Sequence, residues 1–399
     1  MANDEFYQPG GPLFIFVGAE WTITPGYIIE GHMHDMAREH HAYLFYTEHR
    51  YYGESKPTSD ISNENIEYLN LNQSLADLAH FVRTMKATTP GMANSKVILA
   101  GGSFAGSMVT FFRRLYPELA TGCWASSAIV LGKVDFHEYK EIVSESIRQL
   151  GGEACYQRLD NAIAGLTDMF NNQRGEEAKT LLKLCSNFNV SNNLDVSYLF
   201  EQISILVSTF VQYHNDGDIQ QFCQLVMIGD NDINGFANIW RALVTENCTD
   251  MTYKNNIFQF ECNPRQWLYH NCNEFGWFKN SGSGKHFFGT KFPLDLYYQV
   301  CSDCFGAKYN EAFIHQRVDI CNEFYGGLDT NVTNVFFTHG SLDPWKAVGI
   351  QDEKYATIIS NYSHVRDFGS IGPTDSLEMR AAKEEIAQLV REWLGAEDK

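Results

Sequence analysis

A serine flanked by small residues follows an apolar run in the first third of this chain, at Ser103. The run 97–100 has the composition of a strand buried on both faces, and no helix breaker interrupts residues 108–115. Gly101 and Ala105 stand two places before and two places after the serine, where a tight strand-to-helix turn leaves room only for small side chains. The spacing therefore predicts a nucleophile elbow that carries Ser103 between a strand and a helix.

The match to the G-x-S-x-G pattern contains one substitution, because Ala105 stands where the second glycine is usual and Gly106 comes directly after it. A glycine-rich turn with no catalytic role would contain the same tripeptide, and short motifs of this kind also arise by chance. The order of strands, helices and acid or base side chains elsewhere in the chain has to decide between these two interpretations.

Strand-like and helix-like patterns alternate on both sides of the serine turn. Buried-strand runs occur at 13–17, 42–46, 122–128 and 335–338, and helical spacing occurs at 26–40, 72–81 and 376–394. This alternation is typical of an α/β fold built on a parallel sheet. At the start of the last helix, Asp375 and Glu378 have the spacing of a capping box.

Gly18 and Ala19 follow the first strand of the chain. In elbow hydrolases the loop at this place can supply a backbone N–H to the oxyanion hole. An ordinary strand-ending turn is the alternative interpretation.

The middle of the chain, 134–329, lacks this alternation and contains long helical patterns together with most of the cysteines. We therefore expect a mainly helical cap inserted between two parts of an α/β core, 1–133 and 330–399. The cysteines are expected to form disulfides. Cys301 and Cys304 have the C-x-x-C spacing of a redox or metal element, but no second such pair completes a zinc site.

A serine hydroxyl becomes a nucleophile when a neutral imidazole takes its proton and an acid orients that imidazole. In elbow hydrolases the acid and the histidine follow the serine, each in a loop after a later strand. Asp343 comes just after the run 335–338, and His364 follows before the last helix. The predicted catalytic set is therefore Ser103, Asp343 and His364. His32 and His34 would not share one side of a helix, so we expect no metal there and no cofactor.

The formal net charge of −19 argues against a nucleic-acid partner, because the chain has no excess of Lys and Arg to neutralise phosphates. No apolar run has the length of a membrane span, and residues 1–10 have neither the basic start nor the apolar core of a secretion signal. Cysteines and five N-glycosylation sequons nevertheless favour an exported protein whose signal is missing from this chain. The acceptor residues are Asn72, Asn189, Asn247, Asn331 and Asn361.

Several blocks of this chain are similar to those of one family of serine peptidases. The most specific are 48–53 (Glu-His-Arg-Tyr-Tyr-Gly) and 343–345 (Asp-Pro-Trp), at their distances from the elbow 101–106; weaker ones lie at 125–128 and 267–276. The chain resembles the family of lysosomal Pro-Xaa carboxypeptidase, dipeptidyl peptidase II and thymus-specific serine protease over nearly its whole length. Ser107, four places after the serine, makes it most similar to the thymus-specific branch.

The resemblance implies an α/β-hydrolase core with a helical cap, and cleavage of peptides on the carboxyl side of proline near a chain end. It implies Ser103 as nucleophile, Asp343 as orienting acid and His364 as general base. It further implies the backbone N–H of Phe104 as an oxyanion donor, and Trp345 as a residue of the proline pocket. By the same resemblance the protein is expected to be lysosomal or secreted, with proline-containing peptides as ligands and a homodimer left open.

The chain also departs from the family pattern. Phe104, Ala105 and Ile129 replace residues that are usual there, and the segment after His364 has a different spacing of acid and arginine. Cys123 and Cys304 look like additions, which leaves eight cysteines for four bridges of unassigned connectivity. Two rival functions stay open: a serine esterase or lipase on the same fold, and a non-catalytic binding protein that retains the fold.

Overall fold

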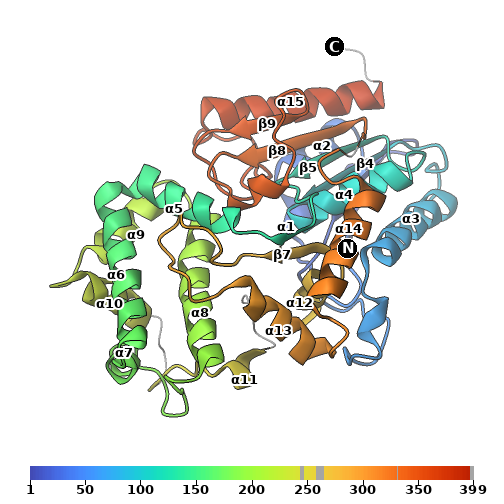
Figure 1. Ribbon diagram of the computed structural model, residues 1–399. Coiled ribbons are helices and arrows are strands. Elements are labelled where there is room, and N and C mark those ends of the chain that lie inside the picture. Colours follow the sequence, from blue (N-terminus) through green and yellow to red (C-terminus); the bar gives the residue numbers. More distant parts are fainter. Residues whose placement is uncertain (243–246, 258–264, 330, 396–399) are drawn as a thin grey trace. The chain divides into compact units, whose positions relative to one another are not determined.

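The computed structural model describes residues 1–242, 247–257, 265–329 and 331–395 (Figure 1). The chain divides into two compact units. Unit 1 combines Met1–Gly132 with Val318–Lys399, and unit 2 is Lys133–Arg317.

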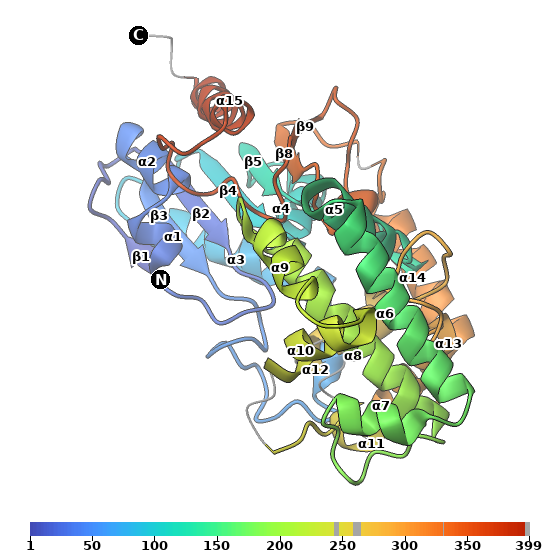
Figure 2. The ribbon, with the colours of Figure 1, turned by 90° about the vertical axis from the view of Figure 1, so that its left-hand side faces the viewer.

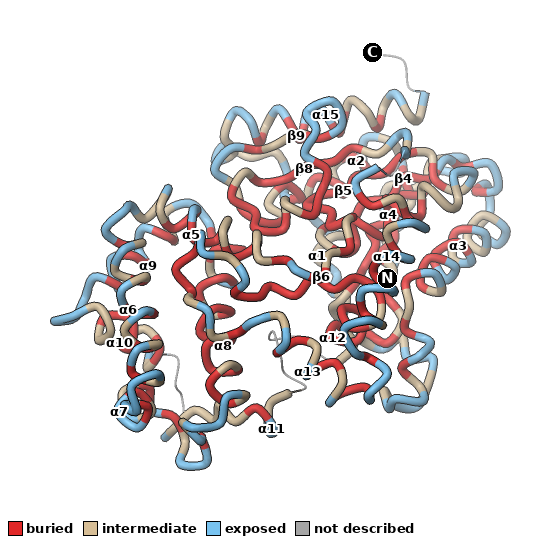
Figure 3. The backbone as a smooth tube through the Cα atoms, viewed as in Figure 1, coloured by how far each residue is buried: buried red, intermediate tan, exposed pale blue. Residues whose placement is uncertain are grey.

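Unit 1 is built on a seven-stranded sheet with the order β1-β3-β2-β4-β5-β8-β9. All neighbouring pairs are parallel except the antiparallel pair of β1 with β3. The strands are β1 (Ala2–Asn3), β2 (Leu13–Val17), β3 (Tyr43–Thr47), β4 (Val97–Gly102), β5 (Gly122–Ser126), β8 (Val335–Gly340) and β9 (Ala356–Ile359). Strands β2, β4 and β5 are buried along their whole length, as Figure 3 shows for the centre of the sheet. This burial on both faces explains why their sequences are continuous apolar or small-residue runs.

Helices cover both faces of this sheet (Figures 1 and 2). They are α1 (Gly26–Ile29), α2 (His32–Glu39), α3 (Leu71–Thr88), α4 (Phe104–Leu115) and α15 (Leu377–Leu394), with short turns of helix at Ile66–Tyr68 and Pro344–Val348. On one face, α1, α2 and α15 form a core with alternate strand residues such as Phe14, Phe16 and Trp124. On the other face, α4 packs against β2, β4 and β5, and α3 packs on α4. The arrangement confirms the α/β class that the alternating pattern predicts.

The single helix predicted over 26–40 is instead two helices. The chain leaves α1 at Glu30 in an extended conformation and turns at Gly31, which has φ = 93°. The N–H of His32 donates to the Phe368 carbonyl at 2.8 Å, and a Cβ on Gly31 would lie only 2.8 Å from that oxygen. The break therefore comes from a distant loop that packs against the helix, which local spacing does not reveal.

The cap of α15 also differs from the prediction. Ser376, not Asp375, is the N-cap residue, and its side chain accepts from the Met379 N–H. Asp375 instead forms an ion pair at 2.9 Å with Lys383, the seventh residue of the helix. Lys383 is almost fully buried, so this pairing satisfies a charge that could not remain unpaired there.

Unit 2 is mainly helical and contains one two-stranded parallel ribbon. Its elements are β6 (Lys133–Asp135), α5 (Glu138–Gly151), α6 (Glu153–Asn171), α7 (Gly175–Leu181), α8 (Asn193–Gln212), α9 (Asp218–Val226), α10 (Asp232–Ala242), α11 (Tyr253–Asn256), α12 (Arg265–His270) with a π-helical turn Asn271–Phe275, β7 (Gly276–Phe278) and α13 (Leu294–Phe305). Among the described residues α8 alone has the length and apolarity of a membrane span, and 67% of that window is buried inside the structure.

The expected insertion 134–329 and unit 2 differ at their carboxyl ends, because helix α14 (Glu311–Tyr325) runs from unit 2 into unit 1. Its second half packs on the core of unit 1. The Asn322 side chain exchanges two hydrogen bonds of 2.8 Å with the backbone of Gly132, and the rings of Tyr325 and Phe111 are 4.6 Å apart. These contacts explain why Val318 onward belongs with the sheet.

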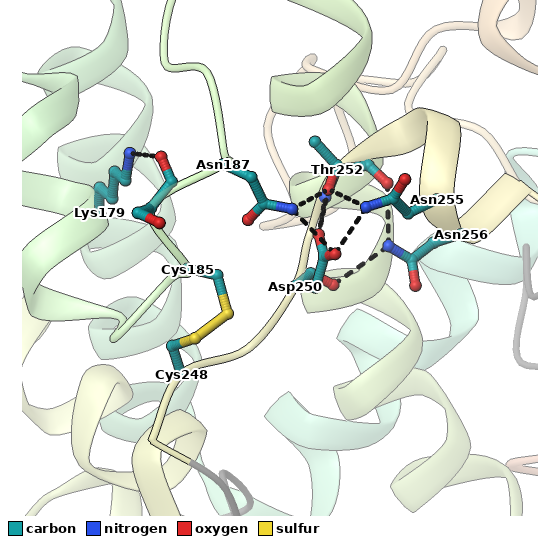
Figure 4. The surroundings of a disulfide bond; sticks show 9 residues. Lys179, Cys185, Asn187, Cys248, Asp250, Thr252, Asn255 and Asn256 are labelled. Atoms are coloured by element: carbon teal, nitrogen blue, oxygen red, sulfur yellow. Dashed lines mark hydrogen bonds between the residues drawn. A yellow bond between two sulfur atoms is a disulfide. The ribbon is translucent and has the colours of Figure 1, made fainter.

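Three disulfides lie among the described residues of unit 2: Cys155–Cys223, Cys185–Cys248 and Cys272–Cys301. Cys123 and Cys304, the two expected additions, form no disulfide, while Cys262 lies outside the described residues. Because Cys301 pairs with Cys272, the C-x-x-C spacing is not a redox pair. Figure 4 shows Asp250 beside Cys185–Cys248, where it accepts hydrogen bonds from Thr252 and from the amides of Asn187 and Asn255.

Loss of the Cys155–Cys223 disulfide is expected to destabilise unit 2. The bridge joins α6 to α9 across a sequence separation of 68 residues. Because a cross-link of that span restricts the unfolded chain, replacing both cysteines with serine should lower the free energy of unfolding by about 4 kcal/mol. Urea unfolding measures the loss, with Cys304→Ala as the control that removes a thiol outside any disulfide. An unchanged urea midpoint in the double variant would contradict the prediction.

Candidate active site

The turn between β4 and α4 has the conformation of a nucleophile elbow. Ser103 occupies it with φ = 57° and ψ = −126°, a strained combination for a residue with a side chain. A Cβ built on Gly101 would lie 2.4 Å from the Ala105 carbonyl oxygen and 3.0 Å from the Ala105 Cβ. The helix therefore crosses the strand too closely for a side chain at 101. The methyl group of Ala105 fits because Gly101, which faces it across the turn, has no side chain. The alanine in place of the second glycine of the motif therefore leaves the turn intact.

Asp343 and His364 form a direct pair in unit 1. Nδ1 of His364 lies 2.9 Å from each carboxylate oxygen of Asp343, and the Trp345 N–H donates to Oδ1 at 2.9 Å. Both side chains are buried, with Asp343 fully so. Burial alone would raise the pKa of Asp343, but the adjacent imidazole and the two hydrogen bonds together lower it. The acid is therefore ionised and can orient the imidazole through Nδ1.

Ser103 and the loop that carries His364 both bond to the end of β5 and the residue after it. The Ser103 N–H donates to the Ser126 carbonyl at 2.9 Å, and the Val365 N–H donates to Ser127 Oγ at 3.0 Å. A Cβ on Gly102 would come within 2.6 Å of Val365 Cγ1. The residue before the serine thus touches the residue after the histidine.

Of the backbone N–H groups expected as oxyanion donors, the structure leaves those of Phe104 and Ala19 as candidates and excludes that of Gly18. Phe104 begins α4, so its N–H lies at the positive end of the helix dipole, as an oxyanion donor requires. The Gly18 N–H instead donates to the Thr47 carbonyl at 2.9 Å. That bond holds the end of β2 against β3 and excludes Gly18 as an oxyanion donor, which leaves Ala19 as the candidate in this loop.

Trp345 and His32 are the remaining residues that the sequence analysis weighed for a functional role. The Trp345 ring is buried and its centroid lies 6.4 Å from that of His364. His32 is hydrogen bonded through Nε2 to the Lys383 carbonyl at 2.7 Å, so it has a structural partner. Among the described residues, no cluster of His, Cys, Asp and Glu could hold a metal ion.

The sequence assigns no role to two further residues near the pair, His339 and Asp367. His339, in β8, is buried, and burial lowers its pKa to about 4, so it stays neutral. Asp367 follows His364 by three positions and is almost fully buried. The one signal for Asp367 in the sequence is its place in the segment after His364, where the spacing of acid and arginine departs from the family pattern.

Glu20, next to Ala19, is expected to make stability depend on pH. Its Oε2 is buried and has no hydrogen-bond partner in the described part of the chain, and burial raises its pKa from 4.5 to about 7. The folded state therefore favours the protonated form, so this group's stabilisation is complete below pH 4.5 and is lost as the pH rises through 7. Glu20→Gln should thus stabilise the protein at pH 8 by on the order of 2 kcal/mol and have little effect at pH 5.

Urea unfolding at the two pH values measures this difference. The matched control is Glu30→Gln, at an exposed glutamate ten residues along the same segment. A stability difference between Glu20→Gln and the wild type that is the same at both pH values would contradict the prediction.

Proteins of similar sequence match nearly the whole length of this chain. A family model described as serine carboxypeptidase S28 matches residues 1–386. The thymus-specific serine protease of Mus musculus is 27% identical over 413 residues, covering 96% of this chain and 80% of its own. The lysosomal Pro-X carboxypeptidase of Homo sapiens is 27% identical over 423 residues, covering 99% and 83%. Among solved structures, proline iminopeptidase of Mycobacterium smegmatis aligns over 99% of this chain and 94% of its own, at 13% identity and a TM-score of 0.40.

Proposed function

This chain belongs to the serine carboxypeptidase S28 family, and on that premise we propose that it is an exopeptidase that cleaves peptides on the carboxyl side of proline. It is a serine-type peptidase by family, with an α/β-hydrolase core and a mainly helical unit inserted between β5 and β8. The observation that carries the proposal is the buried pair of His364 and Asp343 on a loop whose Val365 packs against Gly102, the residue before Ser103.

In the proposed reaction, Ser103 Oγ attacks the carbonyl carbon of the proline residue while Nε2 of His364 takes the hydroxyl proton. Asp343 holds Nδ1–H of the same ring and stabilises the imidazolium that forms. The backbone N–H groups of Phe104 and Ala19 receive the developing oxyanion. His364 then protonates the leaving amine, and a water molecule releases the acyl group from Ser103 by the reverse transfer.

The preference for proline is the finer part of the proposal. Trp345 lies beside His364, and a flat indole ring packs well on a pyrrolidine ring. The relative named lysosomal Pro-X carboxypeptidase supports the same specificity. Cleavage after proline near a chain end releases either one carboxy-terminal residue or an amino-terminal dipeptide.

We further propose a lysosomal or secreted location. Three disulfides in unit 2 fit an oxidising compartment, and the five sequon asparagines are all exposed, as glycosylation requires. We also propose that the protein forms a homodimer. Light scattering tests this by comparing the mass in solution with the 45.4 kDa of one chain.

A panel of peptides at acidic and neutral pH tests the function. It should contain peptides with a penultimate carboxy-terminal proline, X-Pro-reporter peptides with a free amino terminus, matched peptides with alanine for proline, and a short acyl ester. Hydrolysis of one proline class, at least about tenfold above its alanine match, supports the proposal and selects the exopeptidase type. Hydrolysis of the ester alone indicates an esterase, and turnover of none indicates a binding protein; either result contradicts the proposal.

A further inference from the structure

The loop that carries His364 is held at Asp367, whose side chain is 3% exposed. The hydroxyl of Ser126 donates to one carboxylate oxygen, and the hydroxyl of Thr338 donates to the other. Ser126 and Thr338 are direct register partners on β5 and β8. One carboxylate therefore ties the loop to two neighbouring strands near their carboxyl ends.

The same strand end holds the backbone of the loop in a strained conformation. Val365 has φ = 54°, which is unfavourable for a β-branched residue. Its N–H donates to Ser127 Oγ at 3.0 Å, and Ser127 is itself fixed by a 2.7 Å bond from its N–H to the Thr338 carbonyl. Strain of this kind persists only where surrounding contacts determine the conformation.

The end of β5 also holds the nucleophile. The Ser126 carbonyl accepts a hydrogen bond from the Ser103 N–H, and the Ser126 hydroxyl donates one to Asp367. A single residue thus contacts both the elbow and the histidine loop. A shift of the loop at this point would change the distance from Ser103 to His364 without touching either side chain.

We propose that Asp367, Ser126, Ser127 and Thr338, here called the histidine-loop anchor, are positioning residues that set His364 against Ser103. The inference rests on the proposed function for the reaction that His364 serves. Without the anchor, Val365 can relax from its left-handed conformation and displace the imidazole. A displacement of about 1 Å at a reacting group can lower the rate about 100-fold.

The test compares Thr338→Val, which keeps the shape but removes a donor, with Thr338→Ser, which keeps the donor. Thr338→Val and Asp367→Asn should lower both kcat and the rate of labelling by a fluorophosphonate about 100-fold, with KM within about threefold of wild type. Thr338→Ser should stay within about tenfold of wild type. The matched control is Asp375→Asn, which removes a carboxylate bound by Lys383 at 2.9 and 3.0 Å in the same terminal segment.

Asp375→Asn should lower the thermal midpoint and leave kcat and labelling unchanged, because it lies outside the anchor. Labelling of Thr338→Val at the wild-type rate would overturn the inference, as would equal losses in Thr338→Val and Thr338→Ser. The threonine pair decides the matter even if Asp367→Asn fails to fold. A wild-type protein that is labelled but cleaves no proline peptide refutes the proposed specificity, while the labelling rates still test the anchor.

Discussion

Ser103→Ala is expected to lower kcat/KM for the best proline peptide by at least about 10⁴-fold, because the variant has no hydroxyl to form the acyl-enzyme. The residual rate would come from binding and the oxyanion donors alone. KM should change little, since the Ser103 side chain contributes its bond only during the reaction. Steady-state kinetics on the purified variant measure the loss.

The control for this substitution is Ser370→Ala, at an exposed serine six residues beyond His364. It should retain full activity and an unchanged thermal midpoint. If Ser103→Ala kept more than about a tenth of the wild-type rate while folded, Ser103 would not be the nucleophile.

Asp343→Asn is expected to lower kcat about 10⁴-fold, the second largest effect. The two carboxylate oxygens of Asp343 accept the Nδ1–H of His364, whereas an asparagine would present an N–H to that nitrogen. The imidazole would then carry its proton on Nε2, where it cannot accept one from Ser103. The reaction should be measured from pH 5 to pH 9.

Asp343→Asn keeps the size of the buried side chain and the acceptor for the Trp345 N–H, so the fold should be retained. Circular dichroism and the thermal midpoint check this point. A folded Asp343→Asn protein with kcat within tenfold of wild type would contradict the role of Asp343.

The sequence predicted those strands and turns that are determined by a few neighbouring residues. The strands β2, β4 and β8 and the elbow of Ser103 follow from apolar runs and small residues over a few positions. The pairing of Asp343 with His364 follows from their order after the serine, because successive strands of a parallel sheet end at the same edge.

Features that depend on distant contacts were not predictable from the same patterns. Gly31 breaks a helical stretch because the Phe368 carbonyl approaches it. The bond from Gly18 to Thr47, which removes Gly18 from the oxyanion set, joins neighbouring strands. Asp367 binds hydroxyls that are 241 and 29 positions away along the chain, so its role appears only after folding.

The most direct test of the central claim is to identify the residue that a fluorophosphonate modifies, by mass spectrometry of a digest of the labelled protein. We expect one adduct, on the Ser103 hydroxyl, that is absent after His364→Gln. An adduct on a different serine, or no adduct on folded wild-type protein, would contradict the assignment of this site.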